Sequence, residues 1–200
     1  MSKKRVTVAI TGASGAIYSL RTLRALLMCD IAVDVVISEF GWVLLRDEAN
    51  FGGKQKDFGA FVRDQYDVSV EDLALHPLKN LAATLASGSA RSSGMVVVPC
   101  SMKTLAGIAH GLSRNLIERA ADVTLKERRP LIVVPRETPM NLIQLRNMVA
   151  ATEAGAVMVP AMPAFYQEPK TFDDLADFIV GRILSLLGIE HDLYPVWEGN

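Results

Sequence analysis

Three short segments of this chain hold the small, hydroxyl and basic residues from which anion-binding sites are built. They are Thr11-Gly12-Ala13-Ser14-Gly15-Ala16, Ser101-Met102-Lys103-Thr104 and Arg136-Glu137-Thr138. Glycine lets backbone N–H groups approach an anion at the start of a helix, and hydroxyl and guanidinium groups donate hydrogen bonds to phosphate oxygens. Together the segments predict a site for a phosphorylated ligand.

Each segment alone also has a simpler interpretation. The glycine loop at 11–16 is shorter than the dinucleotide fingerprint GxGxxG, and Ser38 stands where an acid would bind a ribose, so a bare tight turn remains open. Ser101 suits a helix N-cap, and Arg136 beside Glu137 suits a surface ion pair. Their occurrence at the ends of successive predicted strands favours one shared site, because ligands bind at the carboxyl ends of parallel strands.

The elements that must position these segments alternate along the chain. Short apolar runs rich in β-branched residues predict buried parallel strands, and amphipathic stretches between them predict helices. We expect strands at 6–11, 33–38, 95–99, 131–135 and 157–160, and helices at 16–28, 42–48, 115–128, 141–154 and about 173–187. Residues 51–93 are the least regular part and are expected to hold two short helices.

Strand–helix alternation of this kind predicts one α/β domain over residues 1–200. We expect a Rossmann-like three-layer sandwich, with an open parallel sheet and helices on both faces. Residues 188–200 are expected to form a C-terminal arm or a frayed end.

Composition excludes several classes of protein. The 200-residue chain has a formal net charge of −1, which gives no sign of nucleic-acid or membrane-surface binding. Its first apolar run is too short for a signal peptide or a membrane span. The two cysteines, Cys29 and Cys100, lack the spacing of a zinc site and fit a reducing compartment. A cytoplasmic protein is therefore expected.

The most specific stretches of the sequence resemble those of one known family. Besides the glycine loop they are Pro99-Cys100-Ser101-Met102-Lys103-Thr104-Leu105, Arg119-Ala120-Ala121-Asp122-Val123, Leu125-Lys126-Glu127-Arg128-Arg129-Pro130-Leu131, Val134-Pro135-Arg136-Glu137-Thr138-Pro139 and Pro163-Ala164-Phe165-Tyr166. On these residues the chain resembles the UbiX-type flavin prenyltransferases, from residue 6 to about residue 197. Members of that family supply prenylated FMN to partner decarboxylases.

The resemblance implies where a flavin and a prenyl donor would bind. FMN would be held by Gly12, Ala13, Ser14, Ser38, Ser101, Met102, Lys103, Thr104, Arg119 and Arg136. The donor, dimethylallyl phosphate, would be held by Lys126, Arg136, Tyr166, Arg182 and Trp197. Family members assemble as homo-dodecamers with sites between subunits, so some of these residues would reach a neighbour's flavin.

The reaction implied by the resemblance joins a dimethylallyl unit to N5 and C6 of reduced FMN, with phosphate as the leaving group. The catalytic residues implied are Glu48, Glu137, Lys126 and Tyr166. Cationic side chains would stabilise the departing phosphate. Ring closure requires a base, for which we expect Glu48 or Glu137 with a raised pKa. On this hypothesis Glu48→Gln slows ring closure more than attachment at N5.

One acidic motif suggests a metal instead. Asp173-Asp174-Leu175-Ala176-Asp177 has the DDxxD pattern that binds magnesium in enzymes that use prenyl diphosphates. Helix capping is favoured, because Thr171 can cap a helix with Asp174 three residues later, and acids stabilise the positive end of a helix. We therefore predict no metal site.

Three other functions remain as alternatives. An FMN-dependent decarboxylase of cysteine-type substrates shares the predicted fold, but its PxANT-like segment is not found. An NAD(P)-dependent oxidoreductase is suggested by the glycine loop, but the ribose-binding acid and a TyrxxxLys pair are missing. A non-catalytic, flavin-carrying subunit of a decarboxylase complex is the third.

Overall fold

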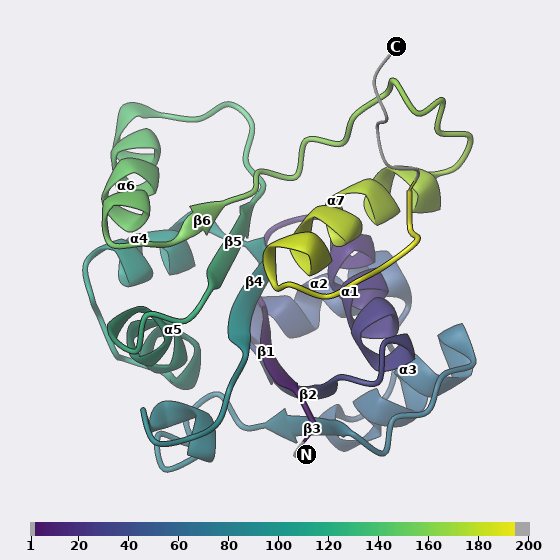
Figure 1. The fold of residues 1–200 in the computed structure, drawn as a ribbon, viewed down its shortest axis with the longest axis horizontal. Helices are drawn as coiled ribbons and strands as arrows, with labels where there is room; N and C mark the ends of the chain where they lie inside the picture. The colour runs from purple at the N-terminus through teal and green to yellow at the C-terminus, as the bar shows by residue number, and fades with distance from the viewer. Residues whose placement is uncertain (1–2, 195–200) are drawn as a thin grey trace.

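A six-stranded parallel sheet forms the centre of the computed structural model, which describes residues 3–194 (Figure 1). The strands are β1 (Arg5–Ile10), β2 (Ala32–Ile37), β3 (Leu73–His76), β4 (Gly94–Cys100), β5 (Leu131–Pro135) and β6 (Val157–Met158). Their order across the sheet is β3-β2-β1-β4-β5-β6, and each neighbouring pair is parallel. The chain changes direction across the sheet between β1 and β4, which is where open α/β sheets bind ligands.

Helices cover both faces of this sheet (Figure 1). On one face lie α1 (Ala16–Met28), α2 (Glu39–Ala49), α3 (Phe58–Tyr66) and α7 (Phe172–Leu186). On the other lie α4 (Met102–Ala109), α5 (Leu116–Lys126) and α6 (Leu142–Glu153). Two short 3₁₀ turns, η1 (Gln55–Asp57) and η2 (Thr84–Ala86), complete the elements. In the described part of the chain no helix is long and apolar enough to cross a bilayer.

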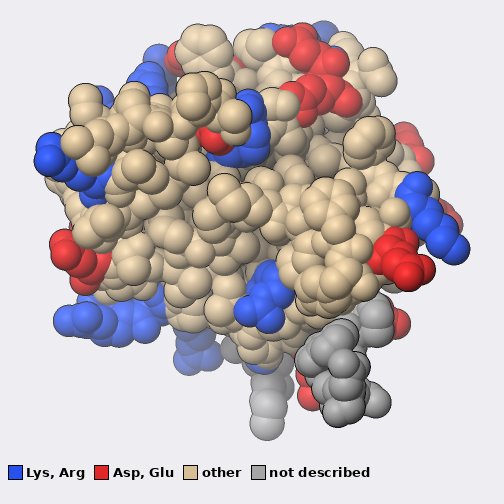
Figure 2. All heavy atoms as spheres, turned by 90° about the horizontal axis from the view of Figure 1, so that it is seen from above, with Lys and Arg blue, Asp and Glu red and all other residues tan. Residues whose placement is uncertain are grey.

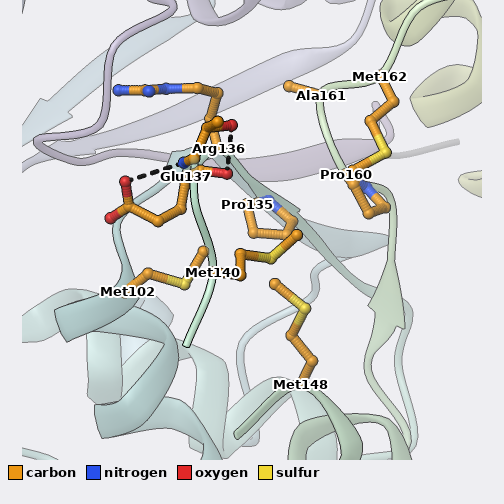
Figure 3. Close-up of a pocket in the computed structure, with 10 residues that line it drawn as sticks. Met102, Pro135, Arg136, Glu137, Met140, Met148, Pro160, Ala161 and Met162 are labelled. Carbon is orange, nitrogen blue, oxygen red and sulfur yellow. Dashed lines mark hydrogen bonds between the residues drawn. The ribbon is translucent and has the colours of Figure 1, made fainter. Parts of the chain in front are cut away.

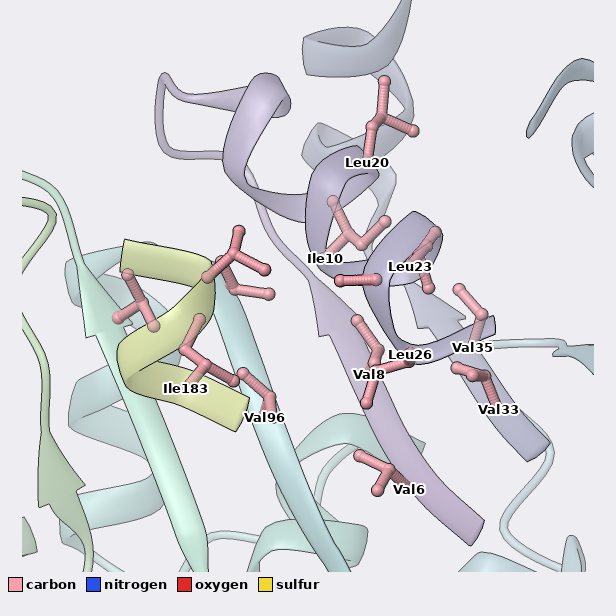
Figure 4. Packing of buried hydrophobic residues seen from close by; sticks show 14 of the residues in the cluster. Val6, Val8, Ile10, Leu20, Leu23, Leu26, Val33, Val35, Val96 and Ile183 are labelled. Atoms are coloured by element: carbon pink, nitrogen blue, oxygen red, sulfur yellow. The ribbon is translucent and has the colours of Figure 1, made fainter. Parts of the chain in front are cut away.

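Alternate residues of each strand enter two separate cores. Val6, Val8 and Ile10 of β1 pack against Leu23 and Leu26 of α1 (Figure 4), while Ala9 faces the core under α4 and α5. Both faces of the central strands are thus buried, and this explains why their sequences are continuous apolar runs. Each fully buried aliphatic side chain stabilises the folded state by about 1.5–3 kcal/mol. The sheet is therefore a stable support for the loops at its edge.

The predicted fold is confirmed, but β3 was missed and α4 was expected only as a helix start at Ser101, without a range. The sequence predicts only short helices over residues 51–93, but β3 adds an edge strand there. Its four residues are all only partly buried, so they give no apolar run. A polar contact holds the edge instead: buried Asp34 of β2 accepts a 3.0 Å hydrogen bond from Arg5 of β1, and its carboxylate lies 2.7 Å from His76 Nε2.

The described part of the predicted C-terminal arm returns along α7. Cys29 Sγ, just after α1, lies 3.7 Å from the Glu190 carbonyl oxygen. The Tyr194 ring then lies 5.4 Å from the ring of Phe178 in the middle of α7. Trp197 lies outside the described residues.

Candidate functional site

Three helices begin around one hollow at the carboxyl edge of the sheet. Ser38 caps α2, Ser101 caps α4 and Asn115 caps α5, and all three line a cavity of about 340 Å³. The cap oxygens accept hydrogen bonds from the third residue along, at 3.0, 3.3 and 3.0 Å. Because each helix start carries a partial positive charge, three of them around one cavity favour an anionic ligand.

Five of the residues predicted to bind a phosphorylated ligand line this cavity. They are Gly12, Ser38, Ser101, Lys103 and Thr104. Glycine is required at position 12, because a Cβ there would lie 2.3 Å from Phe40 Cβ. The loop after β1 and the first turn of α2 therefore approach each other closely at the cavity rim.

Besides the acids Glu39 and Glu118, three polar residues of the cavity wall were not predicted. Lys79 lies after β3, and Arg114 and Asn115 lie in the turn between α4 and α5. None of them directly follows a strand that the sequence predicts, so the strand-end argument missed them. Only Asn115 carried a signal, because Asn before an amphipathic run is a typical N-cap.

Thr11 joins the two loops that flank the change of strand order. Its hydroxyl donates a 2.8 Å hydrogen bond to the Pro99 carbonyl oxygen and accepts a 2.7 Å hydrogen bond from the Ser101 backbone N–H. The side chain is only 1% exposed. The end of β1 and the cap of α4 are thus held together by one buried hydroxyl.

Thr11→Val is expected to destabilise the protein by about 1–3 kcal/mol, since it keeps the shape but leaves the Ser101 backbone N–H without its acceptor. Urea unfolding measures the loss, and Thr11→Ser, which keeps the hydroxyl, serves as the matched control. Equal stability of the valine variant and the wild type would contradict the role given to this hydroxyl.

A second group of predicted residues surrounds the start of α1. The Glu48 carboxylate, near the end of α2, accepts hydrogen bonds from the backbone N–H groups of Gly15 at 2.8 Å and Ala16 at 2.9 Å. Arg136 Nε, just after β5, donates a 3.1 Å hydrogen bond to the Ser14 carbonyl oxygen. The start of α1 is therefore already occupied by a carboxylate from another helix, whereas the starts of α2, α4 and α5 are capped by Ser38, Ser101 and Asn115.

The expected raised pKa of Glu48 is wrong in this structure. Burial alone would raise the pKa of the Glu48 carboxyl, but hydrogen bonds from Ser14, Ala16 and Gly15 and the charge of Arg136 outweigh it, and the pKa is lowered. A carboxylate held in its ionised form by several donors is a weak base. Glu48 is thus placed to organise the glycine loop.

Glu137 lies in a different setting, beside a cavity of about 80 Å³ lined by Met102, Met140, Met148 and Met162 (Figure 3). One of its carboxylate oxygens accepts a 3.1 Å hydrogen bond from the Thr138 backbone N–H. The Arg136 side chain extends away from the methionines. Met102 faces this cavity, whereas Ser101, Lys103 and Thr104 line the larger one. The first turn of α4 therefore contributes to both hollows.

Within one subunit, Lys126 lies away from the other residues predicted to bind the donor. It ends α5, and four residues separate it from the start of β5, which itself spans about 16 Å. A Cβ on Gly88, in the loop leading to β4, would lie 3.2 Å from Lys126 Nζ. The Lys126 ammonium is therefore at the amino edge of the sheet, opposite Ser101 and Arg136.

The other predicted residues lie on the flanks. Arg119 donates to the Ala86 carbonyl oxygen at 3.1 Å and pairs with Asp122 at 2.9 Å. The exposed Tyr166 ring lies 6.1 Å from the ring of Phe178 on α7. Exposed Arg182 is four residues after Phe178, so it projects from the same face of that helix.

The DDxxD motif is occupied by protein groups. Arg21 of α1 pairs with Asp173 at 2.7 Å and also with Asp177. Asp174 forms the predicted capping box with Thr171. Among residues 3–194, no cluster of three or more His, Cys, Asp or Glu side chains has the arrangement of a metal site.

Comparisons with known proteins agree with this geometry. Residues 1–184 match the family described as Flavoprotein. A flavin prenyltransferase UbiX from Halalkalibacterium halodurans is 48% identical over 96% of this chain and 92% of its own length. A crystal structure of AnUbiX (PadA1) in complex with FMN and dimethylallyl pyrophosphate is 40% identical over 99% of both chains, with a TM-score of 0.87.

A third relative is described as an oligomer. A dodecameric FMN-dependent UbiX-like decarboxylase from Escherichia coli O157:H7 is 40% identical over 98% of this chain and all of its own, with a TM-score of 0.84. The likeness to these proteins extends over almost the whole chain. The chain therefore belongs to the Flavoprotein family and, within it, to the UbiX-type flavin prenyltransferases.

Proposed function

We propose that this chain transfers a dimethylallyl group from dimethylallyl phosphate to N5 and C6 of reduced FMN, for use by a partner decarboxylase. The observation that carries the proposal is the cavity at the change of strand order, where three capped helix starts meet. Such a cavity fits the phosphate of FMN. The bound flavin would supply the nucleophilic atoms N5 and C6.

The chain's own residues divide the work on this proposal. Ser38, Ser101 and Thr104 would hold the flavin phosphate through hydroxyl groups and adjacent backbone N–H groups. Gly12, Ala13 and Ser14 would let the flavin approach the loop that Glu48 and Arg136 hold in place. Since the two anchors, Glu48 on α2 and Arg136 just after β5, belong to the folded chain itself, the loop would be preorganised before the flavin binds.

The donor phosphate would be held by cations at the edge of the flavin. Arg136 lies at the carboxyl edge, and Tyr166 and Arg182 lie along one side of α7. Charge that develops on the departing phosphate is stabilised by fixed cations and hydroxyl donors. Lys126 would join them from a neighbouring subunit, because its own sheet separates it from the other residues.

Assembly into a homo-oligomer, which we propose to be a dodecamer, is supported by the surface. Large apolar side chains are exposed on α6 and on the loop before α7, among them Ile143, Val149, Met162 and Phe165. Seen from above, much of the surface is uncharged, with Lys, Arg, Asp and Glu gathered mainly toward its rim (Figure 2). Exposed large apolar side chains gathered on one helix and the loop before α7 are typical of protein–protein interfaces.

The test is the mass of the flavin after reaction. We expect anaerobic incubation of the protein with reduced FMN and dimethylallyl phosphate to add one C5 unit to FMN, and omission of the donor to leave FMN unchanged. Unchanged FMN together with decarboxylation of a cysteine-type substrate would support that alternative instead. Bound but unchanged FMN with no turnover would indicate a flavin-carrying subunit.

A further inference from the structure

The turn between α4 and α5 carries an ion pair built on a buried carboxylate. Glu118, in the first turn of α5, is only 3% exposed. Arg114 Nη2 donates to Glu118 Oε1 at 2.8 Å, and Arg114 Nε donates to Oε2 at 3.2 Å. The Arg114 backbone N–H also donates to Oε2, at 3.0 Å. One carboxylate therefore fixes both the backbone and the guanidinium of Arg114.

The packing of α4 on α5 also leaves space for this carboxylate. A Cβ on Gly107 of α4 would lie 2.6 Å from Glu118 Oε1. Burial alone would raise the pKa of the Glu118 carboxyl, but hydrogen bonds from the Arg114 side chain and backbone outweigh it and lower the pKa. Because an ionised carboxylate is costly to bury without a partner, the arrangement commits Arg114 to one orientation.

The guanidinium itself is not buried. Its side chain is 56% exposed and lines the same cavity as Ser38, Ser101 and Asn115. Of its five N–H donors, two are directed at Glu118. The other three N–H groups can therefore donate to a ligand in the cavity. A guanidinium stays charged at neutral pH, and its planar fork of donors matches the oxygens of a phosphate.

The cavity wall also carries two lysines and one further acid, Glu39, so that with Arg114 and Glu118 it has three cations and two carboxylates. Lys79 and Lys103 line the cavity beside Arg114. Arg114 also directly precedes Asn115, whose side chain caps α5. The turn between α4 and α5 therefore places an oriented guanidinium and the start of α5 at the same cavity.

We infer that Arg114, held in place by Glu118, binds the terminal phosphate of the flavin and makes the site selective for a flavin monophosphate. The inference rests on the proposed function, because it places the FMN phosphate in this cavity. Arg114 would be a binding and specificity residue, and Glu118 a positioning residue that acts through it.

The experiment compares FMN with riboflavin, which has the same ring system without the phosphate. Flavin binding is measured by quenching of flavin fluorescence in the wild type, in Arg114→Ala and in Arg114→Lys. We expect Arg114→Ala to weaken FMN binding about 10- to 100-fold, as for loss of a charged hydrogen bond, and to leave riboflavin affinity unchanged. Arg114→Lys should restore part of the loss, since it keeps the charge without the planar fork.

Two controls separate a binding role from a structural one. Arg63→Ala removes an exposed arginine of α3 that also pairs with an acid, Asp64, and does not line the cavity; this variant should bind both flavins as the wild type does. Glu118→Gln should reduce the preference for FMN over riboflavin while Arg114 is still present. Thermal unfolding and size-exclusion chromatography show whether each variant keeps its fold and assembly.

Equal weakening of FMN and riboflavin binding in Arg114→Ala would overturn the inference, because it would show a general effect on the fold. Unchanged binding of both would overturn it as well. If the wild type failed to bind FMN, the proposed function itself would be wrong. If the wild type bound FMN and Arg114→Ala bound it equally well, only the inference about Arg114 would be wrong.

Discussion

Replacing Lys126 by alanine is expected to lower prenyl transfer by about 10²–10³-fold, although Lys126 lies at the far edge of its own sheet. The size of the effect follows from the proposed role of Lys126 as a cation that stabilises charge on the leaving phosphate. The distance follows from the fold: α5 ends at Lys126 just before β5 begins, whereas Arg136 follows the other end of β5. Both residues can serve one reaction only if they come from different subunits.

Subunit complementation tests this arrangement directly. Lys126→Ala and Arg136→Ala are each expected to be nearly inactive alone. The two variants are co-expressed with separable tags and purified as mixed oligomers, which should recover about a quarter of wild-type activity. In random mixing, about half of the sites receive an intact Arg136 from one subunit, and about half of those also receive an intact Lys126 from the neighbouring subunit. Mixed oligomers of Lys126→Ala with itself, differently tagged, are the control and should recover nothing.

Absence of recovery in assembled mixed oligomers would mean that the two residues act from the same chain or in different steps. A milder loss in Lys126→Ala, below tenfold, would instead mean that the adjacent Glu127 carboxylate, 3.4 Å from the Lys126 ammonium, remains its main partner. Size-exclusion chromatography of each mixture establishes that assembly is intact before activity is compared.

The parts of the fold that were predictable are those in which local pattern and burial agree. β1, β2, β4 and β5 are buried on both faces, so their apolar runs are unambiguous. β3 has no such run, because it lies at an edge and is held by the contact of Asp34 with Arg5 and His76. That contact joins residues about 30 and 40 positions apart, which no local window detects.

The same distinction applies to the site. Ser38 and Ser101 follow predicted strands, so their shared edge could be inferred from parallel-sheet geometry. Arg114 reaches the cavity through a turn between two helices, and only the packing of α4 on α5 determines where that turn lies. Lys126 shows a further limit, since a sequence can name a residue without stating which copy of the chain uses it.

The two candidate bases differ most clearly in what surrounds them. Glu48 accepts backbone hydrogen bonds from Gly15 and Ala16, and its lowered pKa keeps it ionised throughout the neutral range. Glu137 is half-buried and accepts a hydrogen bond from its neighbour Thr138, beside a cavity walled by methionines. The Glu137 carboxylate is therefore less occupied by protein donors than the Glu48 carboxylate, which leaves it freer to contact a bound flavin, and we propose it as the general base.

Glu137→Gln is therefore expected to slow ring closure by about 10²–10⁴-fold, the range for loss of a general base, and to leave attachment at N5 nearly unchanged. Glu48→Gln should instead slow both steps by a similar factor, because it loosens the glycine loop that positions the flavin. Single-turnover absorbance spectra of reduced FMN mixed with donor resolve the two phases. A selective loss of the second phase in Glu48→Gln, with Glu137→Gln unaffected, would reverse the assignment, and it would show that the donors around Glu48 rearrange once the flavin is bound.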